Sequence, residues 1–183
     1  TSGYRLTDYK MNKLKINYKI EYDIIIIMTD YPYENPEITF NYIIEFLNLL
    51  NNKYITAIKP KRIKEHLLSV EMECYFRRNY NGKLIFLYDN LFDLLEKSRV
   101  VITNGSTAGN EALCMNIPAF LINPYKVDDY LYDGYYCYVK SPEELFEKIN
   151  KYLTSGEYDF DSLYKKIYDP INFYDALASV SKL

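Results

Sequence analysis

Short apolar runs alternate with longer amphipathic segments along most of this chain. The first run, DIIIIM at 23–28, is continuous and β-branched, which is typical of a strand that is covered on both faces. Further runs of this kind predict strands at 54–58, 83–88, 100–103, 119–122 and 136–139. A Lys-Pro pair directly after the second run is expected to end that strand at residue 58.

Helical spacing of apolar residues marks the segments between these runs. After the first strand, Pro36 and Glu37 open a segment whose apolar residues recur at intervals of three and four. The sequence Ser141-Pro142-Glu143-Glu144 combines a capping serine, a first-turn proline and early acids, so a helix starts there. The predicted helices are 37–52, 63–74, 91–98, 107–115, 142 to about 153, 162–168 and 173–180.

This alternation of strands and helices with short links predicts the fold class. It is the pattern of an α/β domain with a doubly wound, Rossmann-like parallel sheet, covered by helices on both faces. The 183 residues suit one domain, which we place at 23–183. Segment 1–22 is polar and basic, and we interpret it as a linker or as the tail of a preceding domain.

Composition excludes several classes of protein. The net charge of −3 and the pI near 5.3 argue against a nucleic-acid-binding protein, which usually has a basic balance. Three widely spaced cysteines have neither zinc spacing nor a disulfide framework, and Cys114 is expected to be a small buried apolar residue. With a single histidine, His66, which we expect on a helix surface, we predict no bound metal. No signal peptide or membrane-length apolar run is visible, so a reducing cytoplasm is expected.

Candidate chemistry lies in the loops after the strands, because ligands of such sheets bind beyond the carboxyl ends of the strands. The fourth strand is followed by a turn in which Gly105 permits tight turning and close backbone approach. Either Ser106 or Thr107 is suited to cap the next helix, whose first-turn N–H groups attract an anion. Glu111, one turn inside that helix, is placed to accept hydrogen bonds from ribose hydroxyls, and phosphate plus ribose is a nucleotide.

This turn has an alternative, structural interpretation. It contains neither a Walker A lysine nor a GxGxxG pattern, and an ordinary helix cap followed by a first-turn acid has the same sequence. After the second strand, Lys59, Lys61 and Arg62 form a cationic cluster suited to neutralise phosphate. For Arg62, a solvated helix start explains the sequence equally well.

Segment 88–122 resembles the C-terminal half of GT-B fold glycosyltransferases and their relatives. That group includes capsule and surface-polysaccharide transferases and the non-hydrolysing sugar-nucleotide epimerases. The shared signature is a helix, a VVI strand, a Ser/Gly-rich turn, Glu-Ala-Leu, a small residue, a proline and an apolar strand. It is matched here by Asn104-Gly105-Ser106-Thr107, Glu111-Ala112-Leu113 and Ile117-Pro118-Ala119.

The segment IKPKR at 58–62 resembles the Lys-Pro-His-Pro segment of several capsule and sialic-acid or Kdo-type transferases. It departs from that pattern at Lys61, where those proteins have histidine, although a positive charge remains. In all, the resemblance covers about 23–153.

The resemblance implies a role for each matching position. Ser106 and Thr107, with the backbone at Gly105, would hold the phosphate of a nucleotide-sugar donor, and Glu111 would bind its ribose. The loop from Tyr88 to Asn90 would lie beside the base. Lys59 and Lys61 would act in catalysis by stabilising negative charge on the departing nucleotide.

The resemblance also implies partners. The donor is a CMP-, UDP- or GDP-linked sugar, which is a substrate and not a permanently bound cofactor. A polysaccharide or glycolipid acceptor would bind through an N-terminal half that this chain does not contain, so we expect the isolated chain to be inactive. Peripheral membrane association of the full-length protein is a further expectation.

Two other functions remain open from the sequence. A half-domain of a sugar-nucleotide epimerase shares the fold, but such enzymes need acids and a histidine from both halves, and this half has few. A non-catalytic, receiver-like domain that binds a partner protein shares the architecture. For a receiver, Asp30 and Asp89 fall only loosely at the acidic positions, and no lysine follows the fifth strand until Lys126.

Overall fold

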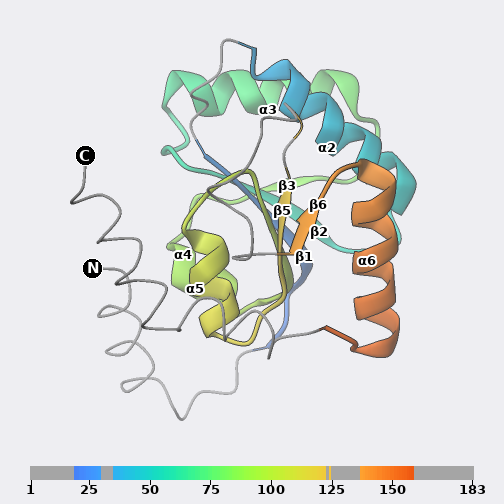
Figure 1. Ribbon diagram of the computed structural model, residues 1–183. Coiled ribbons are helices and arrows are strands. Elements are labelled where there is room, and N and C mark those ends of the chain that lie inside the picture. Colours follow the sequence, from blue (N-terminus) through green and yellow to red (C-terminus); the bar gives the residue numbers. More distant parts are fainter. Residues whose placement is uncertain (1–18, 30–34, 123, 125–136, 159–183) are drawn as a thin grey trace, which may run out of the picture.

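The computed structural model describes residues 19–29, 35–122, 124 and 137–158, which form a parallel sheet flanked by helices (Figure 1). The strands are β1 (Tyr22–Met28), β2 (Thr56–Pro60), β3 (Ile85–Phe86), β4 (Ser98–Thr103), β5 (Ala119–Ile122) and β6 (Cys137–Val139). The helices are α2 (Glu37–Leu50), α3 (Leu67–Asn79), α4 (Leu91–Leu95), α5 (Ala108–Cys114) and α6 (Pro142–Ser155). The helices predicted at 162–168 and 173–180, residues 1–18 of the predicted linker, and the Cys114 side chain lie outside this description.

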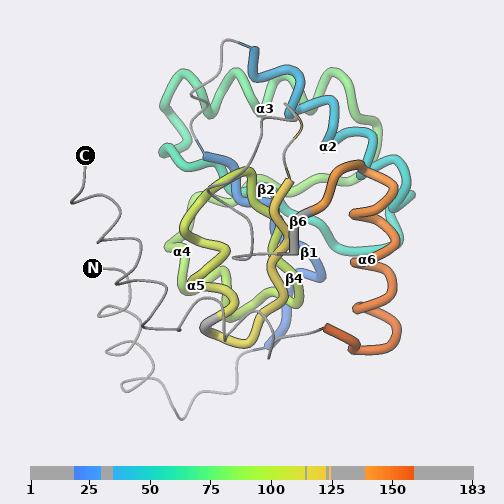
Figure 2. The backbone as a smooth tube through the Cα atoms, viewed as in Figure 1, coloured from blue at the N-terminus to red at the C-terminus, as the bar shows by residue number. Residues whose placement is uncertain are grey.

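The described strands form one sheet in the order β3-β2-β1-β4-β5-β6, and every neighbouring pair is parallel. From β1 the chain adds strands first on one side and then, starting with β4, on the other, as the trace in Figure 2 shows. This is the strand order of the dinucleotide-binding Rossmann fold, so the doubly wound α/β prediction is confirmed.

The central strand β1 is buried on both of its faces, as its continuous apolar run predicts. On one face, Ile24, Ile26 and Met28 pack with residues of α2, α3 and α6. On the other face, Ile25 and Ile27 pack with residues of α4 and α5. Figure 1 accordingly shows α6 on one side of the sheet and α4 and α5 on the other.

Strand β2 continues through Pro60, and the prediction that it ends at residue 58 is wrong. Pro60 pairs with Met28 of β1. The Ile58 carbonyl accepts a hydrogen bond from Leu87 N–H at 2.9 Å, so the backbone polar groups of Ile58, and of Pro60 two residues later, point toward the β3 side. Strand β3 has already ended at Phe86. Proline therefore removes no hydrogen bond from the sheet there, because its missing N–H would have had no strand to bind.

Helix α3 starts four residues later and ends five residues later than predicted. His66 is its N-cap, with Nδ1 accepting a hydrogen bond from Leu68 N–H at 3.3 Å. Two apolar residues of the predicted segment, Ile63 and Leu67, are exposed, at 70% and 67%. The side of α3 that packs on the sheet carries Met72 and Phe76 instead.

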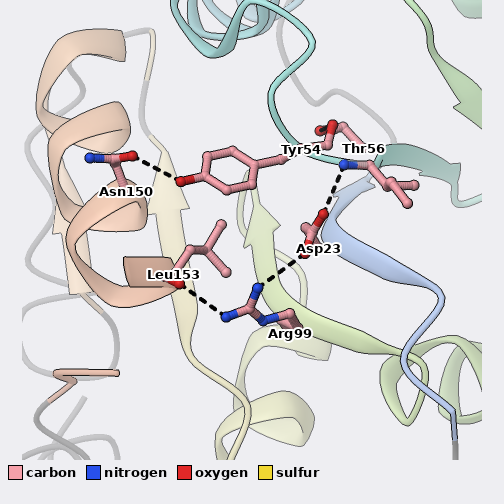
Figure 3. A network of polar contacts seen from close by, with 7 residues as sticks. Asp23, Tyr54, Thr56, Arg99, Asn150 and Leu153 are labelled. Atoms are coloured by element: carbon pink, nitrogen blue, oxygen red, sulfur yellow. Dashed lines mark hydrogen bonds and ion pairs between the residues drawn. The ribbon is translucent and has the colours of Figure 1, made fainter. Parts of the chain in front are cut away.

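Helix α6 starts at the predicted position and is tied to the opposite edge of the sheet. The Ser141 hydroxyl accepts a hydrogen bond from Glu144 N–H at 3.2 Å, as its capping pattern predicts. At the other end of the helix, the Arg99 guanidinium donates to the Leu153 carbonyl at 3.1 Å and contacts Asp23 at 3.2 Å. Figure 3 shows this polar network between α6 and the amino ends of β1 and β4.

Within the described ranges, no helix combines the length and the apolar character needed to cross a bilayer.

Candidate functional site

Strand order reverses between β1 and β4, and one side chain bridges the carboxyl ends of these two strands. The Asn104 side-chain oxygen accepts a hydrogen bond from the Thr29 backbone N–H at 2.9 Å and another from the Thr29 hydroxyl at 3.1 Å. In open α/β sheets this reversal point is where ligands bind. No local sequence signal points to this role of Asn104, because its partner lies 75 residues away in the chain.

The turn after β4 is held by its own hydroxyl groups. Ser106 N–H donates to the Thr103 hydroxyl at 2.9 Å, and the Ser106 hydroxyl accepts from Ala108 N–H at 3.2 Å. Gly105 has φ 110°, a conformation that a side chain would strain. Of the two predicted caps, Ser106 is therefore the one whose hydroxyl engages the helix start, while Thr107 makes no side-chain cap bond and is exposed.

Glu111 lies in the first turn of α5 and is partly buried, with its carboxylate oxygen Oε2 shielded from solvent. The residues of α5 that pack on the sheet are Ala108, Ala112 and Leu113, all nearly inaccessible to solvent. With Ser106 partly buried and Thr107 exposed, the turn is partly open to solvent. The turn and the first-turn acid thus lie together beside the β4 edge of the reversal point.

Lys59 lies on the same face of the sheet as this turn. The strand register places Lys59 beside Ile27 and Ile27 beside Thr103, so the three side chains point to the α4 and α5 face. The Cα atoms of Lys59 and Thr103 are then about 10 Å apart, which is two strand spacings. Burial lowers the pKa of the half-buried Lys59, while the negative charge of Asp89 opposes this shift.

Lys61 lies apart from Lys59, on the other face of the sheet. It is exposed and, with Arg62, lines a cleft of about 230 Å³ between α2 and α3. The walls of the cleft are mainly apolar, and Thr29 belongs both to them and to the bridge with Asn104. The apolar wall residues are Met28, Pro36, Phe40, Pro60, Leu68, Met72 and Tyr75.

This cleft has no signal in the sequence, because each of its walls has the pattern of an ordinary amphipathic element. The structure therefore separates the two lysines of the predicted catalytic pair, and it brings only Lys59 to the face of the serine turn.

Tyr88 and Asn90 both make structural contacts with their side chains. The Tyr88 hydroxyl donates to a carboxylate oxygen of Glu73 in α3 at 3.1 Å. Burial, followed by that hydrogen bond and the charge of Glu73, raises the pKa of Tyr88 to about 12. The side-chain oxygen of Asn90 accepts from Phe92 N–H at 2.9 Å and so caps α4. The loop between these two residues lies at the ligand edge of the sheet, and its Asp89 is exposed there.

In the described part of the chain, no group of three or more His, Cys, Asp or Glu side chains is arranged to hold a metal ion.

Comparison with known proteins gives the fold but no sequence family. No protein-family model matches this chain, and no curated protein matches it by sequence. Among solved structures it is similar to S. aureus MnaA, determined with UDP, with a TM-score of 0.56 and 13% identity over 94% of this chain. It is also similar to the C-terminal domain of a glycosyl transferase group 1 family protein, LpcC, from Francisella tularensis, with a TM-score of 0.53 and 11% identity over 91% of this chain.

A third similar structure is a protein from Listeria monocytogenes that is assigned provisionally as a UDP-N-acetylglucosamine 2-epimerase. Its TM-score is 0.52, with 12% identity over 77% of this chain. The chain spans 53% of MnaA and 38% of the Listeria protein, but 92% of the LpcC domain. At these identities the similarity shows the fold, which is the Rossmann-like fold of a GT-B half-domain.

Strand order also separates this chain from receiver domains. Receivers of the CheY type have the order 2-1-3-4-5, whereas the described strands here have the order 3-2-1-4-5-6. The described strand order is therefore not that of a receiver.

Proposed function

We propose that this chain is the donor-binding domain of a cytoplasmic, nucleotide-sugar-dependent GT-B glycosyltransferase that builds a surface polysaccharide of the capsule type. The observation that carries the proposal is the partly exposed serine turn, with Glu111 one turn further on, at the point where strand order reverses. The fold shared with MnaA, which was solved with UDP, and with the LpcC domain supports it.

In this proposal the turn and α5 hold the donor. Gly105 allows the phosphates to approach the backbone, and Ser106 and Thr107 contact them from the start of the helix. The Ser106 N–H already donates a hydrogen bond to the Thr103 hydroxyl, so the exposed Thr107 is the better placed of the two to contact phosphate. Glu111 accepts hydrogen bonds from the ribose.

The residues that contact the base, and those that stabilise the charge on the departing nucleotide, lie at the ends of β3 and β2. The Tyr88 and Asn90 side chains already form hydrogen bonds with α3 and α4. The loop between these two residues therefore contacts the base mainly through its backbone. Lys59, on the face of the serine turn, stabilises the negative charge that develops on the departing nucleotide. Lys61 acts from the other side of the edge, through the cleft.

The acceptor is a polysaccharide or a glycolipid, and it binds to a second half-domain that faces this edge. The isolated chain accordingly binds the nucleotide but does not transfer sugar. An epimerase half-domain is the second candidate function, favoured by the similarity to the Listeria protein. The two functions differ in outcome, since an epimerase inverts a centre of the free nucleotide-sugar and needs no acceptor.

Thermal unfolding with added nucleotide tests the proposal. We expect one of CMP, UDP and GDP, at 100 times its Kd, to stabilise the chain by about 2.7 kcal/mol, which raises Tm by roughly 5–10 °C. Glu111→Ala should weaken binding of that nucleotide by roughly 10- to 100-fold, because charge-assisted hydrogen bonds to the ribose are lost.

The matched control is Glu147→Ala, which removes an exposed acid from α6 on the other face of the sheet and should leave the nucleotide Kd unchanged. The proposal fails if none of the three nucleotides changes Tm, or if both variants bind like the original chain.

A further inference from the structure

The exposed side of α3 and the turn before it carry large aliphatic side chains. Leu67 and Val70 are 67% and 44% exposed, and Ile63 in the preceding turn is 70% exposed. At 100° per residue, Leu67 and Val70 lie opposite Met72 and Phe76, which pack into the core. The core formed by the described residues therefore does not explain them, because it uses the other side of the helix.

Cations lie among these side chains. Lys61, Arg62 and Lys64 are all exposed, and together they outnumber the two exposed acids of the segment, Glu65 and Glu71. Leu68, 45% exposed, adds a fourth aliphatic residue at the mouth of the α2–α3 cleft. We call this region the α3 surface, formed by Ile63, Leu67, Leu68 and Val70 with Lys61, Arg62 and Lys64.

We propose that the α3 surface binds an anionic membrane, with its aliphatic side chains in the interface and its cations on lipid phosphates. Protein interfaces concentrate aromatic residues and arginine at their centres and deplete lysine, and leucine and valine rarely dominate their binding energy. Exposed aliphatic residues next to a cluster of lysine and arginine are typical of interfacial membrane binding, and here the cations lie in the turn that leads into α3. The composition therefore favours a lipid surface over a protein partner.

The position of this surface fits a membrane enzyme. Lys61, Arg62 and Leu68 also line the cleft at the carboxyl ends of β1 and β2, which is the ligand edge of the sheet. Binding through the α3 surface holds the rim of that edge beside the bilayer, so that a lipid-linked acceptor on the second half-domain can reach it. This orientation rests on the proposed function, whereas the binding itself does not.

Vesicle co-sedimentation of the full chain tests the inference. We expect binding to vesicles of phosphatidylcholine mixed with phosphatidylglycerol, and much weaker binding to phosphatidylcholine alone. Lys64→Gln should weaken binding to the mixed vesicles about 5-fold, since each basic residue near an anionic surface contributes about a factor of this size. The double variant Ile63→Ser/Leu67→Ser should weaken it by at least roughly 10-fold, because two inserted side chains are lost.

Ile55→Ser is the matched control. Ile55 is 55% exposed but precedes β2, at the opposite edge of the sheet, so this variant should bind vesicles like the original chain. Because Ile63 and Leu67 are exposed, the double variant should keep its Tm, which shows that it is folded.

Three results would overturn the inference: no binding to the mixed vesicles, equal binding by the double variant, or equal loss in Ile55→Ser. Self-association that disappears in the double variant, without vesicle binding, would instead identify the α3 surface as a contact between copies of the chain. The nucleotide response of the double variant is measured in parallel. Vesicle binding without any nucleotide response contradicts only the proposed function.

Discussion

At the scale of single residues, Tyr88 links the loop beside the proposed base site to α3. Its hydroxyl donates to Glu73, and burial together with that bond raises its pKa to about 12 from an ordinary value of 10.0. A raised pKa means that the folded state holds the phenolic proton more tightly than the unfolded state does. The stabilisation is complete below pH 10 and is lost as pH rises from 10 to 12.

Tyr88→Phe should therefore make the stability of the chain less sensitive to alkali. We expect the free energy of unfolding to fall less between pH 9 and pH 11 in this variant than in the original chain. The difference should be no more than about 1 kcal/mol, because the group is partly exposed and solvent screens it. Urea unfolding at the two pH values measures this difference. An identical fall in the free energy of unfolding from pH 9 to pH 11 in both proteins would show that Tyr88 is not responsible.

At the scale of elements, α6 shows how a helix is defined at both of its ends. Ser141 caps its start, and the Gly156 N–H donates to the Tyr152 carbonyl at 2.8 Å at its end. Gly156 has φ 75°, in the left-handed region. Leu145, Ile149 and Leu153 lie between these ends and pack against the sheet and α2. The helix thus stops where glycine permits the backbone to reverse, one turn after the core contacts end.

Gly156→Ala isolates the conformational part of this stop signal. A Cβ atom at this position would meet nothing within 4 Å, so the substitution introduces strain without a clash. We expect the free energy of unfolding to fall by about 1 kcal/mol, because a non-glycine residue is unfavourable in the left-handed region.

Gly156→Asn is the control for that substitution. It should cost less than alanine, since asparagine tolerates this conformation better. Chemical unfolding of the three proteins gives the order, and an alanine variant as stable as the original would contradict it.

At the scale of the whole molecule, the bridge between Thr29 and Asn104 joins the two halves of the sheet. On one side of the bridge lies the face with the serine turn, Glu111 and Lys59, and on the other lies the apolar cleft with Lys61. The strand reversal thus produces an edge with two different faces, one polar and one apolar. A ligand or a lipid meets a different chemistry depending on the face it approaches.

Asn104→Ala should loosen this junction more than Thr29→Ala does. The first substitution removes the acceptor of two hydrogen bonds and leaves the Thr29 N–H without its bond, whereas the second removes only the hydroxyl bond. We expect losses of about 2 and about 1 kcal/mol in the free energy of unfolding. Asn104→Asp keeps an acceptor oxygen and should lose less than Asn104→Ala. Urea unfolding measures all three, and equal losses in both alanine variants would show that the backbone bond contributes nothing.

Local signals in the sequence were sufficient for the elements whose cause is local. The apolar run of β1 and the capping pattern at Ser141 each extend over a few residues, and both elements begin within one residue of their predicted positions. The alternation of such elements was also sufficient for the doubly wound class, because helices on both faces require continuous apolar strands. The serine turn follows from the same local logic, since Gly105, Ser106 and Ala108 interact with near neighbours.

Tertiary structure decided what depends on partners that are distant in sequence. Strand order set which loops meet, and so paired Thr29 with Asn104. Lys59 and Lys61 lie on different faces because β2 ends at Pro60, so that Lys61 leaves the alternation of the strand and lines the α2–α3 cleft. Strand β2 continued through Pro60 because β3 is short, which no signal at Pro60 itself contains. Which apolar residues of α3 are buried and which are exposed depends on the face of the helix that packs on the sheet. The physical reason is the same in each case: periodicity encodes how a segment can be buried, but its neighbours determine which side is buried.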